Sequence, residues 1–122
     1  MKKILVVDDE PLVRNALVRF FSASGFSTVS ASDGLEGLEK VASEKPDLVI
    51  ADVDMPQLDG IGLCGMIKKN PATSHIPFLF LSGDGQIGKV EEALENGGDG
   101  YVLKPFDLPR LILKVKGLLG LA

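Results

Sequence analysis

The chain has 122 residues, 45% of them hydrophobic and 25% charged, which suits one globular domain with a core of its own. Its net charge of −4 argues against a general nucleic-acid-binding protein, which would carry a basic face. The single cysteine, Cys64, rules out an intramolecular disulfide and fits a reducing, cytoplasmic location, and no apolar run approaches the roughly 20 residues that cross a bilayer.

The first elements in the chain are a buried strand and a helix. The run "ILVV" at 4–7 is short, continuous and rich in β-branched residues, which predicts a strand covered on both faces. Apolar residues then recur at helical spacing within 10–25, with Pro11 in the first turn, where proline is tolerated, and Gly25 at the end. The segment "STVSA" at 27–31 predicts a second strand.

The middle of the chain continues this alternation. A second helix is predicted at 33–45, because Asp33 and Glu36 have the spacing of a capping box and apolar residues follow at helical intervals. The apolar run "DLVIA" at 47–51 predicts a third strand, and the glycine-rich segment 59–70 predicts a weaker helix.

The last part of the chain predicts two more strands and two more helices. The run "IPFLFLS" at 76–82 predicts a fourth strand, and the pattern at 87–98 predicts a fourth helix. A short fifth strand is expected at 101–104, and a last helix at 107–119 with Asp107 as its N-cap. Apolar residues cover more of that helix than one core-facing stripe needs, so we expect some of them to face outward.

Strands that alternate with helices predict an α/β fold with a doubly wound, five-stranded parallel sheet covered on both faces. Right-handed crossovers favour an open (βα)5 sheet with the flavodoxin-like strand order 2-1-3-4-5. No linker or repeat divides the sequence, so we expect residues 1–122 to form a single domain. In such sheets the functional site lies at the carboxyl ends of the strands.

Those strand ends carry compatible chemistry. The first strand ends in Asp8 and Asp9, the third in Asp52, the fourth in Ser82 and the fifth in Lys104. Clustered carboxylates repel one another unless protons or a cation compensate them. Oxygen ligands without histidine or cysteine suit Mg²⁺. Lys104 can attract an anionic oxygen and Ser82 can donate a hydrogen bond to it. The pattern therefore indicates phosphoryl chemistry with Asp52 as the nucleophile.

Each of these residues also has an ordinary explanation. Asp8 and Asp9 could serve only as caps of the first helix. Ser82 could be a loop hydroxyl, and Lys104 a solvated charge. The combination at four strand ends, and no single residue, favours a functional site.

Four segments together resemble the receiver domain of two-component response regulators, the family that includes the chemotaxis protein CheY. They are "VVDDE" (6–10), "DVDMPQLDG" (52–60), "LSGDG" (81–85) and "YVLKPF" (101–106), and the resemblance covers essentially the whole chain. It implies a signalling protein that receives a phosphoryl group from a sensor histidine kinase or a histidine phosphotransfer protein. Such a domain catalyses its own phosphorylation and dephosphorylation and turns over no external substrate.

The resemblance also implies a role for individual residues. Asp52 would be the phosphoacceptor. Asp9, Asp52 and the backbone carbonyl of Asp54 would hold Mg²⁺, and Asp8 would assist. Lys104 would neutralise the phosphoryl group.

The same resemblance implies how the signal leaves the domain. Ser82 would contact the phosphoryl group as the switch hydroxyl, and Tyr101 would turn inward with it. The fourth helix, fifth strand and fifth helix would form the signalling face, which controls a downstream protein or an attached output domain and could pair two copies in a dimer. The bond before Pro105 is similar to one that is cis in the family. We expect either a stand-alone regulator or a receiver from a longer protein.

Three other functions share parts of this pattern. Asp52 and Asp54 resemble the D-x-D pair of haloacid-dehalogenase-type phosphatases, which also need a second acidic cluster after the lysine. A flavodoxin-type cofactor site wants a Ser/Thr/Gly loop where this chain is acidic. An interaction module with a silent site is the third. Steady turnover of a phosphomonoester would identify the phosphatase, and a coloured protein would identify the flavodoxin-type binder. The absence of an acyl phosphate after treatment with a phosphodonor would identify the silent interaction module.

Residues beside the predicted phosphoacceptor should set the lifetime of the phosphoryl group. Gly83 leaves the approach of water open, and Asp54 and Asp84 stand two residues after Asp52 and Ser82. We expect Asp84→Ala to lengthen the lifetime by removing a carboxylate that orients water, and Gly83→Val to lengthen it further. Dephosphorylation rates at fixed Mg²⁺ measure both effects. A faster loss in Asp84→Ala, or an unchanged one in Gly83→Val, would contradict this prediction.

Overall fold

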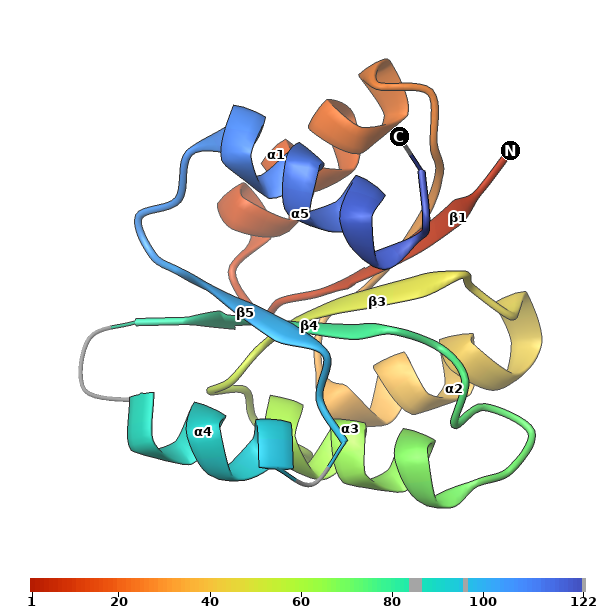
Figure 1. Cartoon of the computed structure of the whole chain (residues 1–122), viewed down its shortest axis with the longest axis vertical. Helices are drawn as coiled ribbons and strands as arrows, with labels where there is room; N and C mark the ends of the chain where they lie inside the picture. The colour runs from red at the N-terminus through yellow and green to blue at the C-terminus, as the bar shows by residue number, and fades with distance from the viewer. Residues whose placement is uncertain (84–86, 96, 122) are drawn as a thin grey trace.

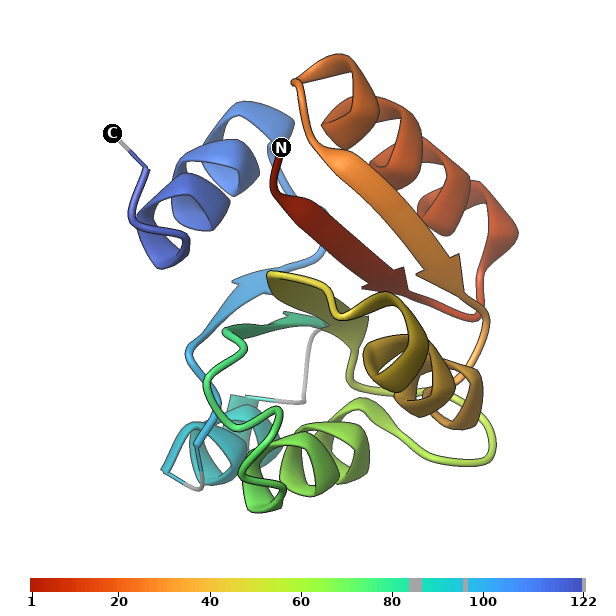
Figure 2. The same cartoon turned by 90° about the vertical axis from the view of Figure 1, so that its right-hand side faces the viewer.

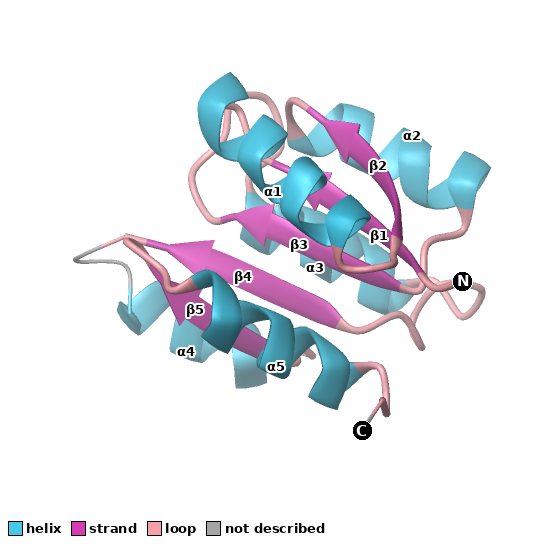
Figure 3. Ribbon diagram, turned by 90° about the horizontal axis from the view of Figure 1, so that it is seen from above, coloured by secondary structure: helices cyan, strands magenta, loops and turns pink. Residues whose placement is uncertain are grey.

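The computed structural model describes residues 1–83, 87–95 and 97–121 as an alternation of strands and helices. The strands form one parallel sheet in the order β2-β1-β3-β4-β5, which confirms the predicted fold class and strand order (Figure 3). In chain order the elements are β1 (Lys3–Val7), α1 (Pro11–Ala23), β2 (Ser27–Ala31), α2 (Gly34–Glu44), β3 (Leu48–Asp52), α3 (Gly60–Lys69), β4 (Phe78–Ser82), α4 (Ile87–Glu95), β5 (Gly100–Leu103) and α5 (Leu108–Leu118).

Helices cover both faces of the sheet and give it two separate cores. Figures 1 and 2 show α1 and α5 on one face and α2, α3 and α4 on the other. Successive side chains of a strand point to opposite faces. On β1, Ile4 and Val6 therefore pack with the α1–α5 layer, whereas Leu5 and Val7 pack with the opposite layer. Cys64 on α3 belongs to this second core, and burial raises the pKa of its thiol to about 11.

The helix ends follow the predicted caps only in part. Asp33 accepts a hydrogen bond from the backbone N–H of Glu36 at 2.8 Å, as the capping box predicts. The Glu36 carboxylate accepts from the backbone N–H of Ser32 at 2.9 Å, so the box closes on the residue before the N-cap. Asp107 occupies the N-cap position of α5, but its side chain makes no capping hydrogen bond.

The helical faces correct one expectation and confirm another. Leu12 is one of the apolar residues that recur at helical spacing within 10–25 and that are expected to face the core, but it is 86% exposed. It lies five positions before the buried Leu17, which is about 140° around the helix and away from the sheet. On α5, Leu111 is buried and Leu113 is 70% exposed, so part of that helix does face outward. Among the described residues, no helix has both the length and the hydropathy needed to cross a bilayer.

The two aspartates at helix starts allow a matched test of capping. Asp33→Ala should lower the free energy of unfolding by about 1 kcal/mol, because it removes the hydrogen bond that caps α2. Asp107→Ala removes the same residue type at the same position without such a bond, and should cost less than about 0.5 kcal/mol. Urea denaturation measures both changes. Equal losses would show that the capping bond is not the cause.

Candidate functional site

The carboxyl ends of β1 and β3 bring the predicted acidic residues together. Asp8 and Asp9 follow β1, and Asp52 is the last residue of β3, the neighbouring strand. One carboxylate oxygen from each of the three lies within 4.8 Å of the others. Asp8 is fully buried, Asp52 is 7% exposed and Asp9 is exposed. The cluster therefore has a buried inner side and an outer side open to solvent.

A close backbone approach fixes the position of Asp52. After β3 the chain turns back, and the N–H of Gly60 donates to the carbonyl of Val53 at 3.0 Å. A Cβ added to Gly60 would lie 2.2 Å from the carbonyl oxygen of Asp52. Only a residue without a side chain can come this close. Sequence reasoning assigned no such role to Gly60.

Lys104 supplies positive charge to the cluster. Its Nζ lies 3.1 Å from Oδ2 of Asp52 and 3.5 Å from Oδ2 of Asp8. Its backbone N–H donates to the carbonyl of Ser82 at 2.7 Å, so the end of β4 holds the residue in place. The Lys104–Pro105 bond is cis, as the resemblance implies.

The cluster has fewer positive charges than negative ones. Burial raises the pKa of Asp52, and the hydrogen bond and charge of Lys104 oppose this effect only in part. Burial likewise raises the pKa of Asp8 against the lowering effect of the Glu10 N–H, which donates to Oδ1 at 2.9 Å. For Lys104, burial lowers the pKa, but the hydrogen bond to Asp52 and the charge of Asp8 outweigh it and leave the pKa raised.

The donor set fits a hard divalent cation. Among the described residues, two buried polar atoms have no hydrogen-bond partner, Asp8 Oδ2 and Ser82 Oγ, and both belong to residues predicted for this site. Buried polar atoms in folded proteins normally have partners. Carboxylate oxygens without nitrogen or sulfur ligands suit Mg²⁺. The exposed carboxylate of Asp54 is not part of the three-residue group, so its role through the backbone carbonyl stays a prediction.

Gly83 and Tyr101, two of the remaining predicted residues, do not belong to the three-carboxylate group. Gly83 directly follows Ser82 at the end of β4, and Asp84 falls outside the described residues. Tyr101 is 36% exposed on β5. Sequence reasoning missed Arg14, whose Nη1 donates to the carbonyl of Asp8 at 2.8 Å. Its position one turn into the first helix, six residues after Asp8, was the available signal.

Comparison with known proteins gives one consistent result. The family model of the response regulator receiver domain matches residues 4–116. The probable transcriptional regulator ycf27 of Cyanophora paradoxa is 42% identical over 118 residues, which are 97% of this chain and 48% of that protein. The response regulator MprA of Mycobacterium avium (strain 104) is 38% identical over 117 residues, 96% of this chain and 50% of that protein.

Solved structures agree with the sequence relatives. A putative response regulator from Chloroflexus aurantiacus J-10-fl superposes with a TM-score of 0.92 at 32% identity, covering 98% of each chain. Chemotaxis protein CheY4 of Vibrio cholerae has a TM-score of 0.90 at 27% identity, covering 97% of this chain and 98% of that one. By contrast, the present chain spans about half the length of the curated relatives it matches.

The shortage of positive charge predicts that neutralising Asp52 stabilises the fold. Asp52→Asn should raise the free energy of unfolding at neutral pH, in EDTA, by on the order of 1–2 kcal/mol. An acid whose pKa is raised by folding binds its proton more tightly in the folded state. The stability of the parent should therefore fall as pH rises above the ordinary value of 3.8, until the folded-state pKa is passed.

Denaturation between about pH 4 and pH 8 measures this effect. The advantage of Asp52→Asn should grow as pH rises from about 4 until the folded-state pKa of Asp52 is passed, and should stay level above it. The exposed Asp107→Asn serves as the control and should show no such growth. A variant at position 52 that is less stable than the parent at neutral pH would show that the charge of Asp52 is already compensated.

Proposed function

The chain belongs to the response regulator receiver domain family, whose members are signalling components of two-component systems and not turnover enzymes. We propose that its Asp52 accepts a phosphoryl group from a phosphohistidine protein. The observation that carries this proposal is the setting of Asp52. It ends a buried strand beside two further carboxylates, and its partner is an ammonium at 3.1 Å. A carboxylate in this setting can act as a nucleophile, and the Lys104 ammonium can contact the negatively charged phosphoryl group that it attacks.

The transfer is a substitution at phosphorus. A carboxylate oxygen of Asp52 forms the new P–O bond while the P–N bond to the donor histidine breaks, and the electron pair stays on the imidazole nitrogen. The Lys104 ammonium is placed to contact an oxygen of the transferred group. Mg²⁺, held by Asp9, Asp52 and the carbonyl of Asp54 with help from Asp8, would supply positive charge to the phosphoryl oxygens.

The signal is lost when the phosphoryl group is transferred from Asp52 to water. Water attacks phosphorus, the P–O bond to Asp52 breaks, and the carboxylate and inorganic phosphate are released. Gly83 at the end of β4, with Asp54 and Asp84, is proposed to set this rate. The domain thereby takes part in its own phosphorylation and dephosphorylation.

The switch is proposed to begin at Ser82. Its Oγ is fully buried and has no partner among the described residues, so a phosphoryl oxygen on Asp52 offers an acceptor for its hydrogen. Tyr101, on the neighbouring strand, is the aromatic residue proposed to move with it. It lines a surface hollow of about 570 Å³ together with Leu103, Phe106 and Arg110.

The α4–β5–α5 region is therefore the proposed signalling face. The exposed Leu113 on α5 adds apolar surface to it. A downstream protein, an attached output domain or a second copy of the chain is its proposed partner. We place residues 1–122 in one receiver domain, in the cytoplasm, with a histidine kinase or phosphotransfer protein as the donor.

Acetyl phosphate with Mg²⁺ tests the chemistry directly. The parent should gain one phosphoryl group by intact mass, and Asp52→Asn should gain none. Asp9→Ala should weaken Mg²⁺ binding at least about tenfold, because it removes a carboxylate ligand. Asp54→Ala is the matched control, since it keeps the backbone carbonyl and should leave Mg²⁺ affinity within about twofold. Labelling of Asp52→Asn would move the nucleophile to another residue.

The phosphorylated sample also tests the signalling face. Backbone NMR shifts should extend from the site to Tyr101 and to α5. Shifts confined to the residues around Asp8 and Asp52 would disprove the coupling while leaving the phosphoacceptor in place.

A further inference from the structure

The strand that leads to Lys104 contains little that fixes its own register. β5 has four residues and lies at the edge of the sheet. Its one buried residue, Gly100, has no side chain to pack, and both Tyr101 and Leu103 are exposed. Only Val102 packs, half-buried, against the core on the α1–α5 side of the sheet. Register is firmly specified where alternate side chains enter a core and weakly specified elsewhere. One half-buried side chain specifies the register only weakly, so contacts outside the strand are needed to fix it.

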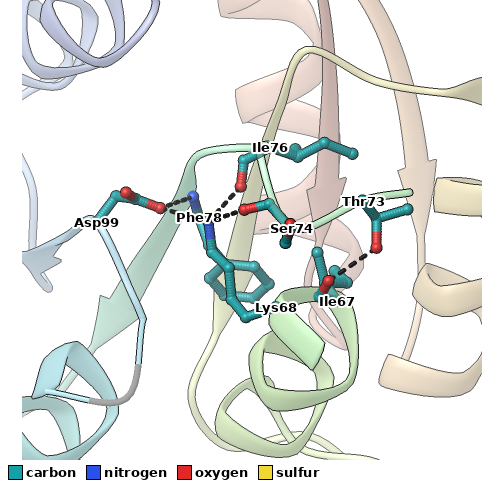
Figure 4. A network of polar contacts seen from close by, with 7 residues as sticks. All are labelled: Ile67, Lys68, Thr73, Ser74, Ile76, Phe78 and Asp99. Carbon is teal, nitrogen blue, oxygen red and sulfur yellow. Dashed lines mark hydrogen bonds and ion pairs between the residues drawn. The ribbon is translucent and has the colours of Figure 1, made fainter. Parts of the chain in front are cut away.

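Asp99, the residue before β5, makes two hydrogen bonds to Phe78, the first residue of β4, and Figure 4 shows the one that its carboxylate accepts. Its backbone N–H donates to the carbonyl of Phe78 at 3.0 Å, and its Oδ2 accepts from the N–H of Phe78 at 2.8 Å. Phe78 is fully buried, with its ring centroid 4.9 Å from that of Phe80. Two bonds to a residue anchored in the core define where β5 begins.

Lys68, near the end of α3, holds the Asp99 carboxylate in this position. Its Nζ donates to Asp99 Oδ2 at 2.9 Å, to the Ile76 carbonyl at 2.6 Å and to the Ser74 carbonyl at 3.3 Å. These bonds use all three hydrogens of the ammonium. The side chain is 13% exposed, and its stem lies beside Gly97. The Asp99 side chain is 37% exposed, so the pair is buried on the lysine side only, and the two backbone carbonyls that Lys68 also binds hold its ammonium in place.

The functional site lies at the other end of the β4–β5 pair. The β4–β5 ladder runs in register to Ser82 opposite Leu103, and the next N–H, that of Lys104, donates to the Ser82 carbonyl at 2.7 Å. A slip of one residue would turn every side chain of the strand to the opposite face. The Lys104 ammonium would then no longer point to Asp52.

We propose that Lys68 and Asp99 are positioning residues for Lys104. They fix the start of β5 on β4, and the register they set delivers the Lys104 ammonium to Asp52 at the far end of the strand. The effect on phosphoryl uptake rests on the proposed function, whereas the effect on register does not.

The first measurement is hydrogen exchange of the Lys104 backbone amide in the whole chain. Asp99→Ala and Lys68→Met should each speed this exchange roughly tenfold and leave the amides of β1 and β3 unchanged. Glu44→Gln is the matched control, because it breaks another partly buried lysine–carboxylate pair, Lys3 with Glu44 at 3.2 Å. It should not change exchange at Lys104.

The second measurement is the initial rate of labelling by acetyl phosphate with Mg²⁺. Asp99→Ala should lower the rate roughly tenfold, but should cause no further loss in a Lys104→Ala background, because the two residues act through one interaction. Lys68→Arg retains a cation that can hold Asp99, and should keep most of the parent's rate.

Two results would overturn the proposal: exchange at Lys104 that matches the Glu44→Gln control, or rate losses in the double variant that simply add. If the parent itself takes up no phosphoryl group, the proposed function fails and the exchange measurement still decides the positioning role. If Asp99→Ala does not fold, Lys68→Met and Asp99→Asn carry the test. Asp99→Asn keeps an oxygen for the Phe78 N–H and should show a smaller effect of the same sign.

Discussion

The interaction on which this structure depends is the sharing of one ammonium between two buried carboxylates, with a third carboxylate beside them, at the end of the sheet. Neighbouring strands place Asp8 and Asp52 side by side, and burial removes the water that would otherwise screen their repulsion. Lys104 reaches both residues but cannot balance the group alone. A site with this deficit favours whatever brings positive charge or removes negative charge.

The sheet itself explains how a site with unfavourable charges can belong to a stable fold. Its two faces bury separate cores, with Ile4 and Val6 on one side and Leu5 and Val7 on the other. The unfavourable charges of Asp8 and Asp52 are themselves buried at the ends of β1 and β3, and the packing of the strands behind them offsets the cost of holding them there. The cores also anchor Phe78, from which the edge strand is positioned.

Much of this arrangement could be predicted from the sequence, because the alternation of apolar runs and helical patterns determines a parallel sheet. Once the sheet is parallel, Asp8, Asp52 and Lys104 all lie at the carboxyl end of the strands, however far apart they are in the sequence. What escaped prediction depends on contacts between distant segments. The close approach of Gly60 to Asp52 and the bonds of Lys68 to three separate backbone and side-chain oxygens leave no periodic pattern in the sequence. Leu12 was misplaced for a related reason, since hydrophobicity does not say which part of a helix passes over the sheet.

The edge position of β5 has a consequence for solubility. A strand at the end of a sheet offers backbone N–H and C=O groups to any other extended chain, and long edges of this kind promote aggregation. Here the edge is four residues long and is followed at once by a lysine and a proline, which can neither extend an apolar edge nor donate a full ladder of hydrogen bonds. This exposed edge strand is thus too short, and too abruptly ended, to recruit other extended chains into the sheet.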